Sequence, residues 1–470
     1  MSSITNRLTI KLKTMKNTIL FDNHDSFVKE EKLGLSYRLN TDSELVSEFF
    51  RGFKYPISSW PIILPKKLTN ELERVSIEIP RLLNQVPELY FKNDAKQIAD
   101  FYFDGNTQMA EFFTLCVQKK TSISSRLDLT YTSEGFKVLE VNVGSSIGGM
   151  EFQHFKPLIE DVHKELLETK RVAYKTRETQ DIYMKFLVDQ IGNVGNQVRI
   201  FLVGKEDDAS KEVQRKFYND LLREELAKNN KKGAVYIDSL DTLKFKNNAL
   251  YYNDNVIHGV LILDYSLTSM SPDLFRALLM DAVYFPDHLG TLFLGDKRNL
   301  GLLRRLAHKK AFSETENELI LKNIPWTEIV EDTEVIYKGK KEPLIGLLKY
   351  KKDEFVVKIA DGLQGKDVYI GKYLSNDEWN NAIEKALQHG KFLAQEFCDS
   401  LDLLAPDETN EWTPHKLVWG AFGFGNRYGG AWVRMSSTKN ISGAINSATG
   451  AVEAIVYEAH PKSTTQILTI

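Results

Sequence analysis

Residues 126–142 read Arg126-Leu-Asp128-Leu-Thr-Tyr-Thr-Ser-Glu-Gly135-Phe-Lys-Val-Leu-Glu140-Val-Asn142, and this stretch decides the fold. Polar and apolar residues alternate on both sides of its glycine, which is typical of two strands joined by a tight turn. A three-residue loop with Gly135 in the left-handed conformation pairs Asp128 with Glu140 and Arg126 with Asn142. The pattern therefore predicts a β-hairpin that gathers two carboxylates, one amide and one guanidinium on one face.

These polar groups suit a magnesium nucleotide. Mg²⁺ accepts few protein ligands, prefers oxygen, and completes its shell with water and phosphate oxygens. Asp128, Glu140 and Asn142 offer such oxygens, and the neighbouring Arg126 would neutralise a transferring phosphoryl group. The alternative is an ordinary amphipathic hairpin with a solvated charged face, because Arg, Asp and Glu are common on exposed strands.

Arg-x-Asp followed by Glu-x-Asn resembles the circularly permuted branch of the ATP-grasp enzymes, which includes the glutathionylspermidine synthase-like amide ligases. The resemblance implies an α+β or α/β ATP-grasp fold, circularly permuted, with a Rossmann-like layer and an N-terminal accessory region. It implies ATP and Mg²⁺ as cofactors. It also gives Arg126 a catalytic role and makes Asp128, Glu140 and Asn142 the magnesium ligands.

A lysine inside an apolar strand is the second signal, in Glu354-Phe-Val-Val-Lys358-Ile-Ala-Asp-Gly362-Leu-Gln364-Gly365. Burying a lysine is costly unless it meets an anion, and a glycine-containing loop can close its N–H groups over phosphates. The segment resembles the ATP-grasp lysine strand and the mobile lid that follows it. The resemblance implies nucleotide contacts for Lys358, Gly362, Gln364 and Gly365; a lysine facing solvent on an edge strand is the alternative.

Four further residues resemble nucleotide contacts of the family. Lys297 stands near an expected helix start, where its charge opposes the helix dipole unless an anion binds there. Gln395 and Glu396 end a short apolar strand where the family reads adenine and ribose. Arg434 lies on an alternating strand that resembles one facing the phosphates. For each of them a solvated side chain or a structural ion pair is the alternative.

A glycine-containing turn, Gly144-Ser-Ser-Ile-Gly148-Gly149, follows the hairpin and precedes an expected helix from about Met150 to Lys170. Glycines before a helix start leave backbone N–H groups that can meet an anion. A flexible connection without chemistry is the alternative.

Length and pattern give the expected domains. A chain of 470 residues with 42% hydrophobic content is long enough for about three domains. We expect an N-terminal accessory or substrate region (1–115), a magnesium-binding half of the core (116–190), a Rossmann-like layer (191–292) and the lysine and lid half (293–470). From Gln197 onward the strand-helix-strand order predicts parallel strands, and the layer has no GxGxxG motif.

Composition excludes several classes. A net charge of −3 argues against a nucleic-acid partner, and the absence of long apolar runs argues against a membrane segment. Two cysteines, Cys116 and Cys398, fit a reducing cytoplasm. Residues 1–20 are basic without acids, which suits either a frayed terminus or a mitochondrial address, and Met15 is an alternative start. Walker A, GxSxG and kinase HRD or DFG motifs are missing.

The expected activity is an ATP-dependent carboxylate-amine ligase that forms an amide through an acylphosphate and releases ADP and phosphate. Its partners would be small-molecule or peptide carboxylates and amines, with no nucleic acid and no membrane. A phosphotransferase of the same fold, or a nucleotide-binding protein without turnover, remains an alternative. The sequence leaves open whether the chain forms a homodimer and which substrates it takes.

Overall fold

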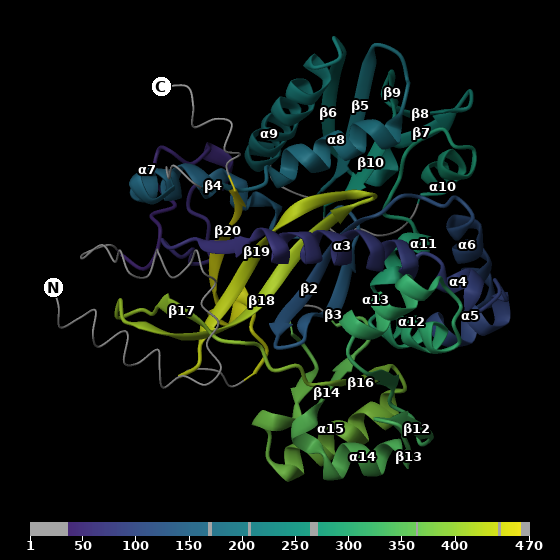
Figure 1. The fold of residues 1–470 in the computed structure, drawn as a ribbon. Helices are drawn as coiled ribbons and strands as arrows, with labels where there is room; N and C mark the ends of the chain where they lie inside the picture. The colour runs from purple at the N-terminus through teal and green to yellow at the C-terminus, as the bar shows by residue number, and fades with distance from the viewer. Residues whose placement is uncertain are drawn as a thin grey trace.

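The computed structural model describes residues 36–167, 172–204, 208–263, 271–362, 365–439 and 443–461. The expectations for residues 1–20 and for Gln364 lie outside these ranges. The described chain is a mixed α+β structure with several sheets (Figure 1). None of its helices is long and apolar enough to cross a bilayer.

An eight-stranded sheet forms the middle of the molecule (Figure 1). Its main order is β1-β20-β19-β18-β2-β3, with β17 paired to β18 and β4 to β20. All of these pairs are antiparallel except β1 with β20. The strands are β1 (Ile62–Pro65), β2 (Ser124–Thr132), β3 (Gly135–Val143), β4 (Val172–Lys175), β17 (Leu403–Pro406), β18 (Trp412–Phe424), β19 (Arg427–Ser437) and β20 (Val452–Pro461).

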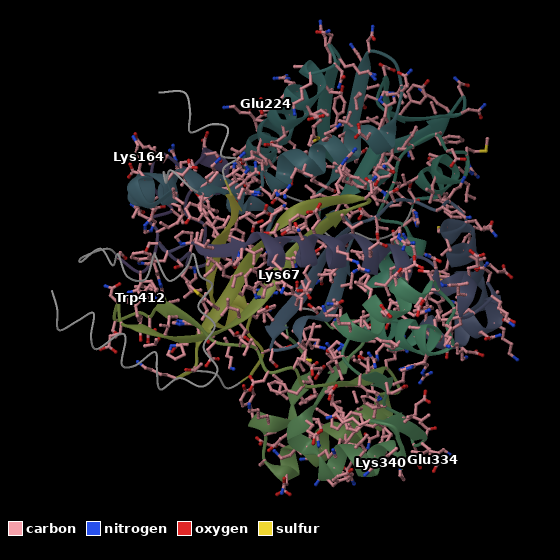
Figure 2. The ribbon with its side chains drawn as sticks, viewed as in Figure 1. Lys67, Lys164, Glu224, Glu334, Lys340 and Trp412 are labelled. Atoms are coloured by element: carbon pink, nitrogen blue, oxygen red, sulfur yellow. The ribbon has the colours of Figure 1, made fainter. Side chains whose placement is uncertain are left out.

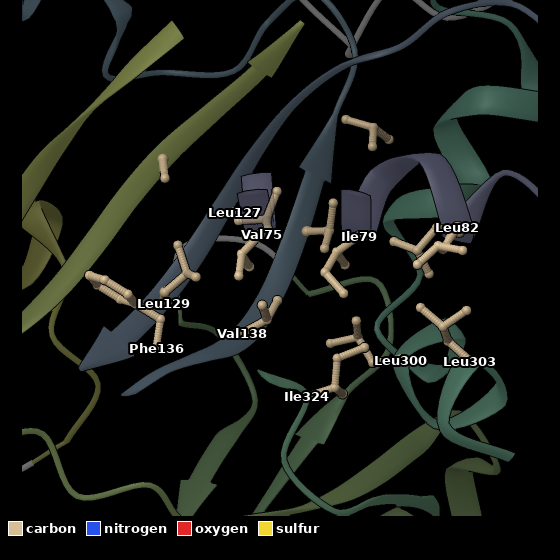
Figure 3. Packing of buried hydrophobic residues seen from close by; sticks show 14 of the residues in the cluster. Val75, Ile79, Leu82, Leu127, Leu129, Phe136, Val138, Leu300, Leu303 and Ile324 are labelled. Atoms are coloured by element: carbon tan, nitrogen blue, oxygen red, sulfur yellow. The ribbon is translucent and has the colours of Figure 1, made fainter. Parts of the chain in front are cut away.

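One face of this sheet is covered by the amphipathic helix α3 (Lys66–Leu83). Its apolar residues recur every three or four positions and face the sheet, while Lys67 lies on the outer side (Figure 2). Figure 3 shows Val75 and Ile79 packing beside Leu127 and Leu129 of β2. Because this face of β2 is filled by core, the alternating polar residues must lie on the opposite face.

The described part of the N-terminal region joins the central sheet and its core. Ile62 and Ile63 of β1 pair with β20, and α3 belongs to the core of the central sheet. Strands β17 to β20 likewise join the hairpin β2 and β3, not the lysine strand. The expected boundaries at 115 and 293 therefore do not follow the sheets, because strand pairing over such separations leaves no local signal in the sequence.

A three-stranded sheet, ordered β10-β5-β6, lies at the top in Figure 1. Strands β5 (Gln197–Val203), β6 (Lys232–Asp238) and β10 (Gly259–Ile262) run parallel, which confirms the parallel strands predicted from Gln197 onward. Helices α8 (Thr179–Ile191) and α9 (Asp208–Ala227) accompany it. The hairpin expected near Lys244 is a three-stranded meander of β7 (Leu243–Lys246), β8 (Ala249–Tyr252) and β9 (Asn255–Ile257).

The lysine strand belongs to a third sheet, ordered β11-β16-β14-β15, at the bottom in Figure 1. A capping box at Ser375 and Glu378 starts its helix α15, and Gly390 in the left-handed conformation ends it, so the expected helix Asn376–His389 is confirmed. The elements of this layer are β11 (Thr327–Ile329), β12 (Glu334–Tyr337), β13 (Lys340–Pro343), α14 (Leu344–Tyr350), β14 (Phe355–Ile359), β15 (Val368–Ile370), α15 (Asn376–His389) and β16 (Phe392–Glu396).

The remaining helices fill the space around the sheets. They are α4 (Val86–Leu89), α5 (Ala95–Tyr102), α6 (Thr107–Val117), α7 (Lys156–Leu167), α10 (Pro272–Leu279), α11 (Leu289–Leu292), α12 (Arg298–His308) and α13 (Glu314–Asn323). A 3₁₀ segment, Met150–Phe155, replaces the first part of the helix expected after the glycine turn. Residues 168–170, the last part of that expected helix, lie outside the described ranges.

Candidate active site

The hairpin of β2 and β3 has the predicted register: Asp128 pairs with Glu140 and Arg126 with Asn142. The turn that sets it differs from the expectation. Gly135 has a positive φ of 102°, but it pairs with Thr132, so the loop holds only two residues. A bulge at Leu139 restores the register. Leu139 therefore lines the same cavity as Glu140, and the expected alternation of these two residues is wrong.

Asp128 is held by two arginines. Its Oδ1 accepts a hydrogen bond from Arg126 Nε (2.7 Å), and its Oδ2 accepts from Arg126 Nη2 (3.1 Å) and Arg434 Nη2 (2.5 Å). The residue is only 4% exposed. Burial raises the pKa of this carboxyl, but the guanidiniums of Arg126 and Arg434 outweigh it and hold the pKa well below its usual range. Asp128 is thus an ionised anchor for both arginines.

The indole ring of Trp432 packs against the two guanidiniums. Arg126 and Arg434 lie 5.8 Å and 5.0 Å from the centre of its ring. Gly149 touches the same ring at a φ of 97°, and a Cβ there would lie 1.8 Å from Trp432 Nε1. Only glycine fits at this point, so the close approach of the turn and the ring explains this residue.

The glycine turn fixes Arg126. The carbonyl oxygen of Gly148 accepts from Arg126 Nη1 (2.9 Å). Two of the turn's N–H groups are already used: Ser145 donates to Asp287 Oδ1 (2.7 Å) and Gly149 to Glu151 Oε2 (2.9 Å). These two groups meet carboxylates of the protein and are therefore not free for an anion.

Lys358 is a buried cation, so the alternative of a solvent-facing lysine is excluded. It is 6% exposed, and its Nζ donates to the carbonyl oxygen of Leu139 (2.8 Å) and to Gln395 Oε1 (2.9 Å). Burial is the main cause that lowers its pKa to about 8; Glu140 opposes the shift and Lys297 adds to it. Leu139, the residue inserted at the bulge, therefore uses its backbone carbonyl oxygen to hold this lysine in place.

Lys297 and Glu140 face each other across the same space. Lys297 precedes α12, and its Nζ donates to the carbonyl oxygen of Gly362 (2.7 Å) and lies 3.4 Å from Glu140 Oε2. Glu140 Oε1 accepts from Asn142 Nδ2 at 3.4 Å. With a side chain that is 27% exposed and two long contacts, Glu140 is held more loosely than Asp128.

Gln395 and Glu396 are both engaged with protein groups. Besides holding Lys358, the buried Gln395 donates from Nε2 to Thr327 Oγ1 (3.2 Å). Glu396 Oε1 accepts from Tyr337 Oη (3.0 Å) and lies 3.2 Å from the ammonium of Lys338. Gln395 thus positions the lysine, and adenine or ribose recognition by these two residues stays a prediction.

A cavity of about 1090 Å³, counted with its part open to solvent, lies between the polar face of the central sheet and the lysine layer. Among the described residues, its lining omits Arg126 and Asn142, which form the next pair on the same face, two positions beyond Asp128 and Glu140. It brings together nine of the expected residues: Asp128, Glu140, Lys297, Lys358, Gly362, Gly365, Gln395, Glu396 and Arg434.

The donor set fits Mg²⁺ with unequal roles. The described residues contain no group of three His, Cys, Asp or Glu side chains suited to a metal. Magnesium, however, needs only one or two carboxylates beside water and phosphate oxygens. Glu140 and Asn142 can supply oxygens. A carboxylate has about four acceptor positions, and the arginines use three of those of Asp128, which leaves one for a metal.

Three residues of this region escaped the sequence analysis: Glu151, Trp432 and Glu453. Glu453 carried a usable signal, because an acid stands inside the apolar strand Val452–Pro461 just as Lys358 stands inside its own strand. Trp432 carried none, since an aromatic residue on a strand is common.

Solved structures share this fold. The matches comprise 44 chains. One is a glutathione synthetase-like effector of Globodera pallida in its apo form, with a TM-score of 0.51 and 13% identity over 86% of this chain and 90% of that chain. At this identity the likeness concerns the fold alone, and at that level it confirms the resemblance seen in the sequence. No family model matches the chain, and a sequence comparison with curated proteins finds no match.

We expect Lys358→Met to weaken ATP binding about tenfold or more, because a charge-assisted contact contributes about 1.5–3 kcal/mol. The pKa of about 8 adds a pH dependence. In the wild type, ATP affinity should fall as the pH rises through about 8, since the protonated lysine that a phosphate needs is lost. The variant should lack this dependence. Calorimetric titrations from about pH 6.5 to 9.5 measure both effects.

Lys349→Met is the matched control, because Lys349 is exposed on α14 of the same layer. It should leave ATP affinity and its pH profile unchanged. An ATP dissociation constant for folded Lys358→Met equal to that of the wild type would contradict a phosphate-facing role for Lys358.

Proposed function

We propose that the chain is an ATP-dependent carboxylate-amine ligase of the circularly permuted ATP-grasp type, which forms an amide and releases ADP and phosphate. One observation carries the proposal: a single cavity is lined by Lys358 of the lysine layer, by Lys297 at the start of α12 and by the Asp128–Arg434 pair on the sheet. The fold likeness to a glutathione synthetase-like protein supports it at the level of the fold.

ATP would lie between the central sheet and the lysine layer. Its phosphates would meet Lys297, Lys358 and the loop with Gly362, Gln364 and Gly365, and Arg434 would balance charge from the sheet side. Magnesium held by Glu140, Asn142 and the remaining position of Asp128 would neutralise phosphate oxygens. The base would contact the apolar cavity wall formed by Val356, Ile370, Phe397 and Leu417.

The chemistry needs positioning and charge, not a protein nucleophile. An oxygen of the substrate carboxylate attacks the γ-phosphorus, the bond to ADP breaks, and an acylphosphate forms. Arg126 and Arg434 stabilise the charge on the transferring group. The neutral amine nitrogen then attacks the acyl carbon, the bond to phosphate breaks, and the departing phosphate takes the proton that the nitrogen loses. Cys398 lines the cavity but is no nucleophile, since burial raises its pKa to about 12.

The test is a search for ADP release with Mg²⁺ and ATP over amino acids, short peptides and polyamines, with hydroxylamine as a trap. For the acid that is a substrate, we expect a hydroxamate formed in step with ADP and dependent on ATP. A phosphorylated product that resists hydroxylamine would instead support a phosphotransferase. If no acid stimulates ADP release, the ligase proposal is wrong, and a nucleotide-binding protein without turnover is the remaining interpretation.

A further inference from the structure

A second charged cluster adjoins the two arginines on the side away from Lys358. Glu453 of β20 is the register partner of Arg434 on β19, so both side chains lie on the face of the sheet that carries Asp128. Glu151, which follows the glycine turn, is close enough to influence both Arg126 and Glu453. On this face of the sheet, the carboxylates of Glu151 and Glu453 therefore lie next to Arg126 and Arg434, on the side away from Lys358.

Glu453 is buried and incompletely paired within the part of the chain that the structure describes. It is 3% exposed, and within the described ranges its Oε2 has no hydrogen-bond partner. Arg434 Nε also lacks a partner there, because the guanidinium turns its Nη2 to Asp128. Burial raises the pKa of Glu453 to about 7, with Glu151 adding to the shift and Arg434 and Arg126 only partly opposing it. A buried carboxylate oxygen without a hydrogen-bond partner lowers the stability of the fold, unless a ligand donates the missing hydrogen bond.

The cluster borders the nucleotide cavity. The loop from Gly443 to Asn446 lines that cavity, and Ser447, the next residue, contacts Glu453. Arg434 lines the cavity and stands opposite Glu453. Moving along this face from the lysine layer, one meets the phosphate-facing lysines, then the Asp128 arginines, then the two glutamates. A group bound at the glutamates would therefore lie beyond the position of the transferred phosphoryl.

We propose that Glu453 and Glu151 form the subsite that binds the amine substrate as its ammonium ion, whose proton passes to Glu453 before the neutral nitrogen attacks; this rests on the ligase function proposed above. An ammonium offers three donors and a positive charge, which match the free Oε2 of Glu453 and the second carboxylate. A substrate carboxylate would be repelled there and drawn to Arg126 and Arg434. The negative glutamates would thus bind the amine substrate, and the positive arginines would bind the carboxylate substrate.

The test compares two amines as probes of the full chain. 1,4-Diaminobutane is protonated near neutral pH, whereas hydroxylamine is neutral and does not need an ammonium subsite. Calorimetric titration with 1,4-diaminobutane in the presence of MgADP should detect binding to the wild type and a loss of at least about tenfold in affinity for Glu453→Gln. Hydroxamate formation should fall far less, so the ratio of the two readouts identifies the subsite.

Glu411→Gln, at an exposed position before β18, is the control and should bind the diamine like the wild type. Wild-type protein that does not bind the diamine, or an equal affinity in Glu453→Gln, would overturn the subsite while leaving a hydroxamate result intact. A purely structural Glu453 would instead lower the melting temperature and weaken ATP without a selective loss of amine. Should Glu453→Gln fail to fold, Glu151→Gln takes its place in the same titration, with the same expected loss.

Discussion

Glu140→Gln should reduce turnover by about a thousandfold or more while the fold stays intact, because metal coordination supplies several kcal/mol of charge stabilisation. The substitution removes one charge and hardly changes volume. Glu140 is the loosely held carboxylate that lines the cavity, and its buried neighbour Lys297 keeps its hydrogen bond to the carbonyl oxygen of Gly362 after the change. The measurements are ADP release at saturating ATP and the Mg²⁺ concentration that gives half-maximal rate, with circular dichroism to check folding.

Glu134→Gln is the control for this prediction. Glu134 lies in the turn of the same hairpin and forms an exposed ion pair with Lys137. Its loss should leave the rate within about twofold, since exposed pairs contribute little. Near-wild-type ADP formation by folded Glu140→Gln would rule out the assignment of Glu140 to the metal.

Arg126→Ala should suppress hydroxamate formation by about a hundredfold to a thousandfold, the usual loss when one donor to a developing charge is removed. ATP binding should change little, because Arg126 does not line the nucleotide cavity. Asp128 would keep one of its two arginines, Arg434, and so remain ionised. Hydroxamate yield and ATP affinity, measured on the same preparation, separate the two effects.

Arg427→Ala is the matched control, because Arg427 begins β19 and pairs with Asp189 at the surface. It should form hydroxamate like the wild type. Full hydroxamate yield from Arg126→Ala would place this arginine in a structural role and shift transition-state stabilisation to Arg434. A loss of ATP affinity that matches the loss of hydroxamate would mean that Arg126 contacts the nucleotide itself.

Local patterns predicted the parts of the site that depend on neighbouring residues. The alternation in residues 126–142 gave the pairing of Asp128 with Glu140, and a lysine among β-branched residues gave the burial of Lys358. The bulge at Leu139 could not be foreseen, because one inserted residue leaves the composition of the strand unchanged. The loop is one residue shorter than predicted, and this offsets the residue inserted at the bulge. The predicted pairing of Asp128 with Glu140 is therefore correct although the predicted loop length is wrong.

Long-range partners were beyond the reach of the sequence. Arg434 meets Asp128 across 306 residues, whereas the sequence left open whether it faces phosphates or holds a structural carboxylate and did not say which one. Gln395 was expected only at a strand end that contacts the nucleotide, and nothing local indicated that its side chain holds Lys358. Such choices depend on how separate elements pack, and no local period encodes them.

The pairing of β1 with β20 has a consequence for the making of the protein. Ile62 and Ile63 must wait for Val456 and Tyr457, which the ribosome adds hundreds of residues later. Asp128 likewise waits for Arg434, and β2 waits for its neighbour β18, both of which are made only shortly before β20. We expect folding to be slow and to finish only after synthesis. Nascent chains stopped before Val452 should therefore be protease-sensitive and bind no nucleotide, however complete their other layers are.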